Sequence, residues 1–583
     1  MRKISWLVAA IFCTALWAPR AKAQATGIVE RLSPDTFFYL KWNGAASLKG
    51  ANSPNHVLQL FNDPDFLPIK IALAGRLNQS MAKPGAGPAP QAEDLLSLLD
   101  NAGVFGFTVP SKRTGDAAGD PASHGAGMFL VYDATGKSEL IQKLEAEFQA
   151  KDKKAQEESS YEFEGVPVRV EGKDKDKSYK AQAGHFYLFA NQKELIEDLI
   201  ARYRGSQAPA TTLIHRPEFE AARKYADADS AIEAFGRMPN LTEMIPDDPK
   251  NATAKHVVQN LHTEKVHALT MSVNFAGEAM RIRGAVLGDT SPQSLFDLAG
   301  ESGKEFQTMP VVSANPSFQI MRMNLAALYD LIMRALEGNL TLQQQANVKA
   351  GEAMAQAYLG MPIRDALGLF SGEFGWGSQY SGDGTEEKLY AVTIENPEAL
   401  LRILRATLGS YILAEDSSGG TTFLDFAYPY KDPESGTQRR KFYYVAVTPH
   451  LLLAAPRKAI LRSAMTQANP GASSGVATAA GGTATGSAAG AASSVEYAQL
   501  RSQLPEKLSG LNAADLRLIP WDKILSNLSE QAAETAKKEK NGTPADMSWL
   551  KQVNPEIVTR HVHLSVGGWW KDSNGIYFDS FLQ

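Results

Sequence analysis

The chain has 583 residues and a single cysteine, Cys13. Cys13 falls in an N-terminal segment that we expect to be cleaved, so we expect no disulfide in the mature protein. Small exported domains commonly depend on disulfides for stability. This chain must instead fold by burying apolar side chains, and its length and 44% hydrophobic composition allow roughly two to four domain cores.

No charge of one sign dominates the sequence. The chain has 59 Lys and Arg against 64 Asp and Glu, a formal net charge of −5, and these charges are spread along it. Nucleic-acid-binding proteins concentrate basic residues on one face or stripe. The sequence therefore predicts no nucleic-acid partner.

Long apolar runs are also scarce. The run near the N-terminus, Ile4 to Ala18, spans 15 residues, whereas a membrane helix needs about 20. Arg2 and Lys3 precede this run, and Ala21-Lys22-Ala23 follows it as an A-x-A cleavage pattern. We therefore expect a signal peptide over residues 1–23, a periplasmic or secreted location, and no transmembrane span in the mature chain.

Internal similarity is abundant. The stretch from His185, HFYLFANQKELIEDLI, resembles HLLLAAPRKAILRSAM from His450, and each predicts an apolar strand followed by a helix. The pattern predicts two tandem similar copies, 34–300 and 309–583. Further matches in the same order are LKWNGAASL from Leu40 with MRMNLAALY from Met321, GVFGF from Gly103 with GEFGWG from Gly372, YEF at 161–163 with TTF at 421–423, and MSVNF from Met271 with LSVGG from Leu564.

The glycine-rich stretch GEFGWG could be a phosphate-binding loop or a strand. A phosphate loop is followed directly by a helix N-terminus and commonly by a Lys-Ser/Thr pair. Here aromatic and small residues alternate with period two, and the first copy continues to Pro110 and a charged loop. The stretch therefore predicts a strand, in which Gly106 and Gly375 admit a close neighbour.

Short polar turns between alternating segments predict an α+β fold, in which each copy is a mainly antiparallel sheet with helices packed on one face. Asn574-Gly575 predicts a tight turn in the last hairpin. Residues 467–494 are almost wholly Ala, Gly, Ser and Thr and predict a disordered insert in the second copy. A Pro/Gly-rich insert at 79–91 predicts a surface loop.

His561 and His563 are the candidate metal ligands of the sequence. On a strand, two histidines at this spacing point to the same face, as zinc sites require. No third ligand is identifiable, and the repeat alignment places Ala268 and Thr270 at the matching positions. The pair is therefore either a metal site or, as the sequence favours, two surface histidines.

Trp569 and Trp570, beside the aromatic residues Tyr577 and Phe578, are the candidate ligand-binding residues. An exposed aromatic platform of this kind stacks on sugars. Adjacent strand residues face opposite sides, so at most one of the two indoles is expected to be exposed while the other lies in the core.

The order of these features resembles that of exported bacterial protein families that carry a domain of unknown function. The resemblance rests on the signal peptide, the duplicated strand and helix units and the recurring G-x-F-G-[FW] strand. It implies a location in the bacterial envelope or outside the cell, and it transfers no catalytic residue.

The sequence contains no HExxH, Walker A or clear GxGxxG pattern at a strand-to-helix turn. We therefore expect a non-enzymatic binding or structural scaffold protein without a cofactor, whose partner is a protein or another envelope component. Two alternatives stay open. One is a carrier that holds a lipid or other apolar ligand between the two copies, and the other is a cell-envelope hydrolase with an unrecognised site.

Overall fold

A computed structural model describes most of the chain after residue 26. The predicted signal peptide and the insert at 79–91 lie outside the described residues, as do positions 469–489 of the second insert. The described residues are 27–44, 54–67, 97–109, 126–151, 158–172, 177–205, 211–227, 230–238, 252–275, 277–292, 294–336, 340–382, 384–431, 436–468, 490–527 and 556–583, with the single positions 69, 94, 530 and 554.

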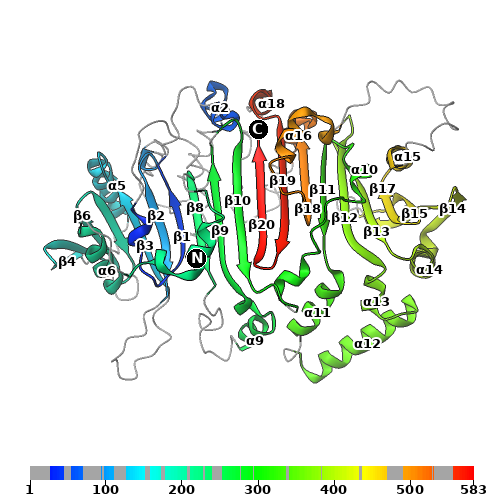
Figure 1. Cartoon of the computed structure of the whole chain (residues 1–583), viewed down its shortest axis with the longest axis horizontal. Helices are drawn as coiled ribbons and strands as arrows, with labels where there is room; N and C mark the ends of the chain where they lie inside the picture. Colours follow the sequence, from blue (N-terminus) through cyan, green and yellow to red (C-terminus); the bar gives the residue numbers. More distant parts are fainter. Residues whose placement is uncertain are drawn as a thin grey trace.

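Twenty strands form one continuous sheet, in which all neighbouring strands are antiparallel, and helices pack against it (Figure 1). The predicted α+β class and antiparallel pairing are therefore confirmed. The first ten strands are β1 (Thr36–Trp42), β2 (Gly103–Thr108), β3 (Gly127–Asp133), β4 (Glu158–Phe163), β5 (Val166–Glu171), β6 (Ser178–Ala183), β7 (Phe186–Ala190), β8 (Ile232–Arg237), β9 (Val266–Asn274) and β10 (Met280–Gly288). The second ten are β11 (Ser317–Arg322), β12 (Phe370–Tyr380), β13 (Glu386–Ile394), β14 (Ile412–Ser418), β15 (Thr421–Lys431), β16 (Gln438–Val447), β17 (Leu451–Ala455), β18 (Gly510–Asp515), β19 (Leu564–Asp572) and β20 (Gly575–Leu582).

The strand order reads the same from both edges of the sheet. From one edge it runs β4, β5, β6, β7, β3, β2, β1, β8, β9, β10. From the other edge it runs β14, β15, β16, β17, β13, β12, β11, β18, β19, β20. The two series meet where β10 pairs with β20, and Figure 1 shows the two edge strands β4 and β14 at opposite ends of the molecule.

Helices lie on both faces of the sheet. On β1, Tyr39 belongs to a core with Ile196 and Phe219 from the helices after β7, whereas the adjacent Leu40 belongs to a separate core with Val57. Because successive strand residues point to opposite faces, a strand that is apolar on both sides needs cover on both sides. The prediction that helices pack on one face only is therefore wrong. The helices used below are α2 (His56–Asn62), α5 (Ser138–Lys151), α6 (Lys193–Arg204), α7 (Pro217–Arg223), α12 (Leu342–Leu359), α14 (Pro397–Leu408), α15 (Lys458–Ala468), α16 (Val495–Arg501) and α18 (Glu556–His561).

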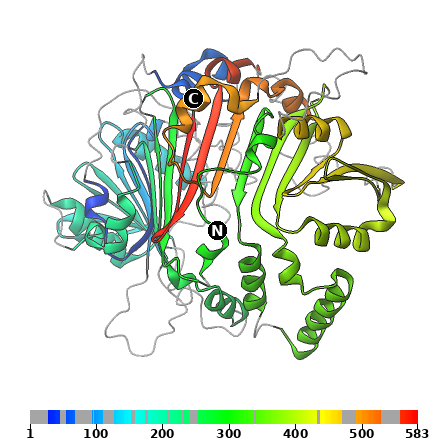
Figure 2. The ribbon, with the colours of Figure 1, turned by 45° about the vertical axis from the view of Figure 1, so that its right-hand side comes forward.

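The second half repeats this arrangement of two cores. Ile320 on β11 packs in a core with Leu461 of α15, and Leu400 of α14 packs with Val447 in another. Trp570 contacts the main core of each half, so the two cores meet beside the β10–β20 pair. Figure 2 shows the sheet continuing through this central region without interruption.

The GEFGWG stretch lies in β12, and GVFGF lies in β2, so the strand prediction is confirmed. A Cβ atom at Gly106 would lie 2.5 Å from Cζ of Phe129, and one at Gly375 would lie 2.7 Å from Oγ1 of Thr308. Both glycines therefore admit a close neighbour, as expected.

Two boundaries differ from the sequence alignment. YEF at 161–163 ends β4, whereas TTF at 421–423 begins β15. The strand in the second half that corresponds to β4 is β14, so the two stretches do not lie in corresponding strands. The insert predicted at 467–494 is narrower than expected, because Ala468 still belongs to α15 and Ala491 is fully buried.

Among the described residues, we find no helix with the combined length and apolarity needed to cross a membrane.

Candidate functional site

Trp569 and Trp570 both lie on β19 and are both half-buried. The ring of Trp570 stacks on Tyr577 of the neighbouring strand at a centroid distance of 5.7 Å. The indole of Trp569 occupies the space that a side chain at Gly510 would need. Both indoles therefore contact the protein's own sheet, and their role as a ligand platform stays a prediction.

His561 is the last residue of α18, and His563 lies just before β19. The expectation that both point to one face of a strand is therefore wrong, because the helix ends between them. Nε2 of His561 lies 2.7 Å from Oδ2 of Asp63, and the rings of His56 and His563 are 5.8 Å apart. Within the described ranges, no group of three or more His, Cys, Asp or Glu is arranged to hold a metal ion.

The interactions of His561 connect the two halves of the chain. Nδ1 of His56 in α2 lies 2.9 Å from the backbone oxygen of His561, and Nη1 of Arg560 donates to Asp63 at 3.0 Å and to Asp65 at 3.2 Å. The hydrogen bond from His561, more than any other contact, lowers the pKa of Asp63. The sequence could not indicate this contact, because its partners are about 500 residues apart.

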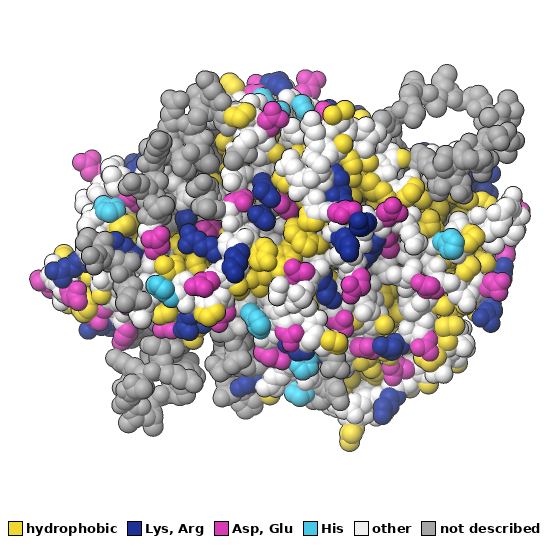
Figure 3. Space-filling model, in the orientation of Figure 1, with side chains coloured by type: hydrophobic (Ala, Val, Ile, Leu, Met, Phe, Trp, Pro, Cys, Tyr) yellow, Lys and Arg dark blue, Asp and Glu magenta, His cyan; other side chains and the backbone are white. Residues whose placement is uncertain are grey.

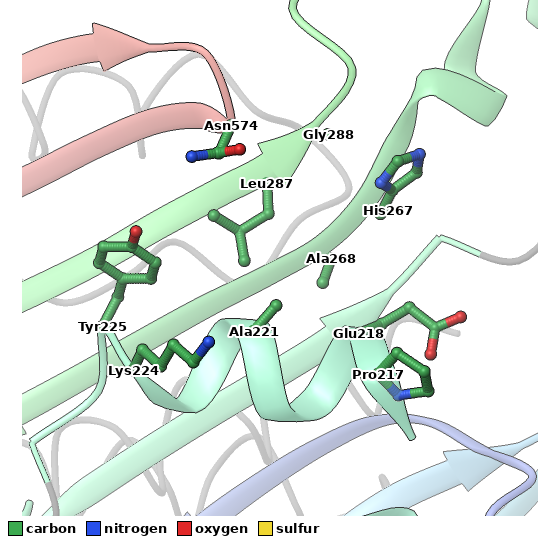
Figure 4. A pocket seen from close by; sticks show the side chains of 10 residues that line it. All are labelled: Pro217, Glu218, Ala221, Lys224, Tyr225, His267, Ala268, Leu287, Gly288 and Asn574. Atoms are coloured by element: carbon green, nitrogen blue, oxygen red, sulfur yellow. The ribbon is translucent and has the colours of Figure 1, made fainter. Parts of the chain in front are cut away.

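A pocket of about 460 Å³ lies between α7, the β9–β10 pair and the β19–β20 turn (Figure 4). Apolar and charged side chains both line it. Oε2 of Glu218 is buried without a hydrogen-bond partner. Because one lining residue, Asn574, belongs to the second half, this pocket draws on both halves. The lining residues are Pro217, Glu218, Ala221, Lys224, Tyr225, His267, Ala268, Leu287, Gly288 and Asn574.

A network of charged side chains lies beneath α5. The buried Glu145 accepts hydrogen bonds from Nη2 of Arg169 and from the hydroxyl of Tyr187, both at 2.6 Å. Nζ of Lys180 lies 3.6 Å from Glu145 and 2.6 Å from Glu171. Burial, followed by the charge of Glu145, raises the pKa of Tyr187 far above its usual range. Arg169 and Lys180 are therefore each paired with a carboxylate in this partly buried network.

The matching place in the second half is more apolar, although Arg405 of α14 forms an exposed ion pair with Glu415 there. There α14, which follows β13 as α5 follows β3, packs Leu400 and Leu404 against Val445 and Leu452. Arg169 and Lys180 face each other across β5 and β6, as Leu424 and Val445 do across β15 and β16. These two places hold the same position in the strand order but differ in chemistry.

Exposed apolar side chains are concentrated near one edge of the sheet. Six of the twelve large apolar side chains that are exposed in the described parts of the chain belong to α14 or to β13–β16. Sequence reasoning missed this surface, although the alternating aromatics in TTFLDFAYPY and the RRKFYY stretch opposite them carry the signal. The six are Tyr390, Leu408, Leu413, Tyr428, Tyr430 and Phe442.

Elsewhere the surface is mixed in charge. Figure 3 shows acidic and basic side chains interspersed over the face that it draws, without a large region of one sign.

No protein-family model, curated protein or solved structure matches the chain. Inference about function therefore rests on the geometry described above.

Proposed function

We propose that this protein is an exported, non-enzymatic scaffold of the bacterial envelope that binds a partner protein or another envelope component. The observation that carries the proposal is the single sheet, whose two halves follow one strand order and join edge to edge. A continuous antiparallel sheet resists separation of its parts, because backbone hydrogen bonds link every strand to the next. Such a frame holds distant surfaces at fixed positions, as a scaffold requires.

We further propose that the two halves are tandem copies, 34–300 and 309–583. Residues at a constant offset of 265 share the same cross-strand partners at one end of each series, which supports the proposal: Tyr179 faces Ala190 as Tyr444 faces Ala455. The helices that follow these strands, α6 and α15, begin at Lys193 and Lys458, at the same offset.

The seam between the halves is strengthened by a sheltered ion pair. Arg281 on β10 donates from Nε to both carboxylate oxygens of Asp579 on β20, at 2.9 and 3.2 Å. Asp579 is 2% exposed, and Arg281 supplies the positive charge that compensates this sheltered carboxylate. The ion pair supports a scaffold that works as one body.

A second candidate function is that of a carrier for a small apolar ligand. The observation that favours it is the pocket beside α7. Ala221, Ala268 and Leu287 belong to its apolar lining, and Asn574 reaches it from the second half. Pockets of this size bind small organic molecules when apolar walls surround a few polar groups.

Native mass spectrometry of the protein purified from its own host envelope, before and after solvent extraction, distinguishes the two functions. The scaffold proposal predicts an unliganded mass and, after mild crosslinking, a specific protein neighbour. An extractable adduct of defined mass would favour the carrier. Turnover of an envelope substrate that a single substitution abolishes without unfolding would contradict both.

A further inference from the structure

The hairpin of β15 and β16 is longer than its counterpart at the other end of the sheet. β15 and β16 contain 11 and 10 residues, whereas β5 and β6 contain six each. β14 begins at Ile412 opposite Phe426, so residues of β15 beyond Ala427 have no strand partner on that side among the described residues. The hairpin therefore projects beyond the sheet, with both strands exposed at its end.

Several tyrosine side chains lie on one face of this hairpin because of the way its two strands pair. Tyr428 faces Lys441 and Tyr430 faces Arg439 across the two strands, and side chains of paired residues share a face. The ring of Tyr411 lies 5.6 Å from that of Tyr428. We call Tyr390, Tyr411, Tyr428, Tyr430, Tyr443 and Lys441 the tyrosine surface.

Within the described part of the chain, Lys441 contacts a tyrosine of this surface and forms no ion pair with a carboxylate. Its Nζ lies 5.4 Å from the ring centre of Tyr443. The hydrogen bond to Tyr443 comes first among the causes that raise the pKa of Lys441, and the fields of Tyr430 and Tyr390 add to it. Lys441 therefore stays charged at neutral pH, with the ring of Tyr443 beside it.

The sheet edge here is protected against addition of another strand. Pro429 lies in the part of β15 that extends past β14, and it has no backbone N–H to donate. Proline in an edge strand commonly prevents another strand from pairing with it. The edge strand β14 carries the acidic residues Glu415 and Asp416. A partner is therefore expected to meet the side chains of the tyrosine surface rather than to extend the sheet.

We propose that the tyrosine surface binds an acidic segment of a partner protein, which rests on the scaffold function proposed above. Tyrosine and arginine are enriched in protein interfaces, where a tyrosine ring supplies a large contact area with little conformational entropy to lose. Lys441 supplies a positive charge within this surface, beside the ring of Tyr443. Charge complementarity therefore selects a negatively charged segment.

The test uses fluorescence anisotropy of a labelled ten-residue polyglutamate peptide with the full mature chain. We expect the peptide to bind, Lys441→Glu to weaken binding at least tenfold, and Tyr428→Ser with Tyr430→Ser to weaken it at least fivefold. Leu342→Ser on α12, a position 85% exposed, is the matched control and should leave binding unchanged. Urea midpoints within error of the parent chain would show that each variant is folded.

Several outcomes would overturn the assignment. Binding that is unchanged in Lys441→Glu, or that is as tight for polylysine, would contradict an acidic ligand. Binding of heparin or phosphatidylglycerol vesicles but not of the peptide would replace a protein partner by a glycan or a membrane. If a partner crosslinks to the chain purified from its host, and these substitutions do not reduce the crosslinking, the surface assignment fails while the scaffold function stands. If no partner crosslinks at all, the scaffold function fails.

Discussion

Arg281 and Asp579 lie 298 residues apart in the sequence, yet they form a bidentate ion pair across the seam where β10 pairs with β20. The carboxylate of Asp579 is nearly inaccessible to solvent, while the guanidinium of Arg281 is one-third exposed. Removal of one partner from such a pair leaves a charge without compensation, which is strongly destabilising.

The first prediction concerns this seam. Arg281→Ala should lower the free energy of unfolding by about 3 kcal/mol, because Asp579 loses its partner in a sheltered site. Arg364→Ala is the control, since the ion pair of Arg364 with Asp330 is exposed and should contribute far less to the free energy of unfolding. Urea denaturation at pH 7 measures both, and equal losses would contradict the role of the seam.

The contact between Asp63 and His561 predicts a dependence of stability on pH. Because the folded state lowers the pKa of Asp63 below its ordinary 3.8, this contribution is complete above pH 3.8 and is lost as the pH falls through the folded value. The urea midpoint of the parent chain should therefore fall between pH 5 and about pH 2 by more than that of Asp63→Asn. Identical pH profiles would show that Asp63 does not stabilise the fold.

The close approach at Gly106 predicts a clash. Gly106→Ala would bring Cβ within 2.5 Å of Phe129 and 2.7 Å of the backbone oxygen of Phe38. We expect a loss of about 1–3 kcal/mol. Gly351→Ala in α12 meets no atom within 4 Å and should stabilise the chain by about 0.5–1 kcal/mol. Thermal unfolding separates the two, and tolerance of alanine at Gly106 would show that the neighbouring strands can move apart.

The network beneath α5 predicts a contrast between one substitution and several. Glu145→Ala alone should cost about 1–2 kcal/mol, because the buried hydroxyl of Tyr187 and the half-exposed Arg169 lose their shared acceptor while Lys180 keeps Glu171. Replacement of the whole network by apolar residues of the kinds found beneath α14 should be neutral or stabilising. The combined variant is Glu145→Leu, Arg169→Leu, Lys180→Val, Tyr187→Leu and Glu171→Gln. If it unfolds, the two places are not interchangeable, which would count against the proposed tandem copies.

Local patterns predicted the parts of the fold that depend on neighbouring residues. Alternation of aromatic and small residues identified β2 and β12, and an apolar run followed by helical spacing identified β7 with α6 and β17 with α15. These features follow from side-chain period alone. The sequence also favoured contact of at least one indole with the sheet, and both Trp569 and Trp570 make such contacts.

Long-range contacts were beyond the reach of the sequence. The pairing of β10 with β20 and the contact of His561 with Asp63 depend on the path of the whole chain. Helix cover on both faces was missed because alternation shows which side of a strand is more apolar, not whether the other side is also buried. The tyrosine surface was missed although its aromatic residues alternate in the sequence, because the register that puts Tyr428 opposite Lys441 is known only from the paired strands.

The most direct test of the single scaffold is amide hydrogen exchange along the seam. If the two halves form one body, the paired amides of β10 and β20, from Met280 opposite Leu582 to Leu287 opposite Gly575, should exchange as slowly as those of β1 and β11 inside each half. Rapid exchange of β10 and β20 beside slow exchange within each half would show two bodies that separate, and it would contradict the proposed scaffold.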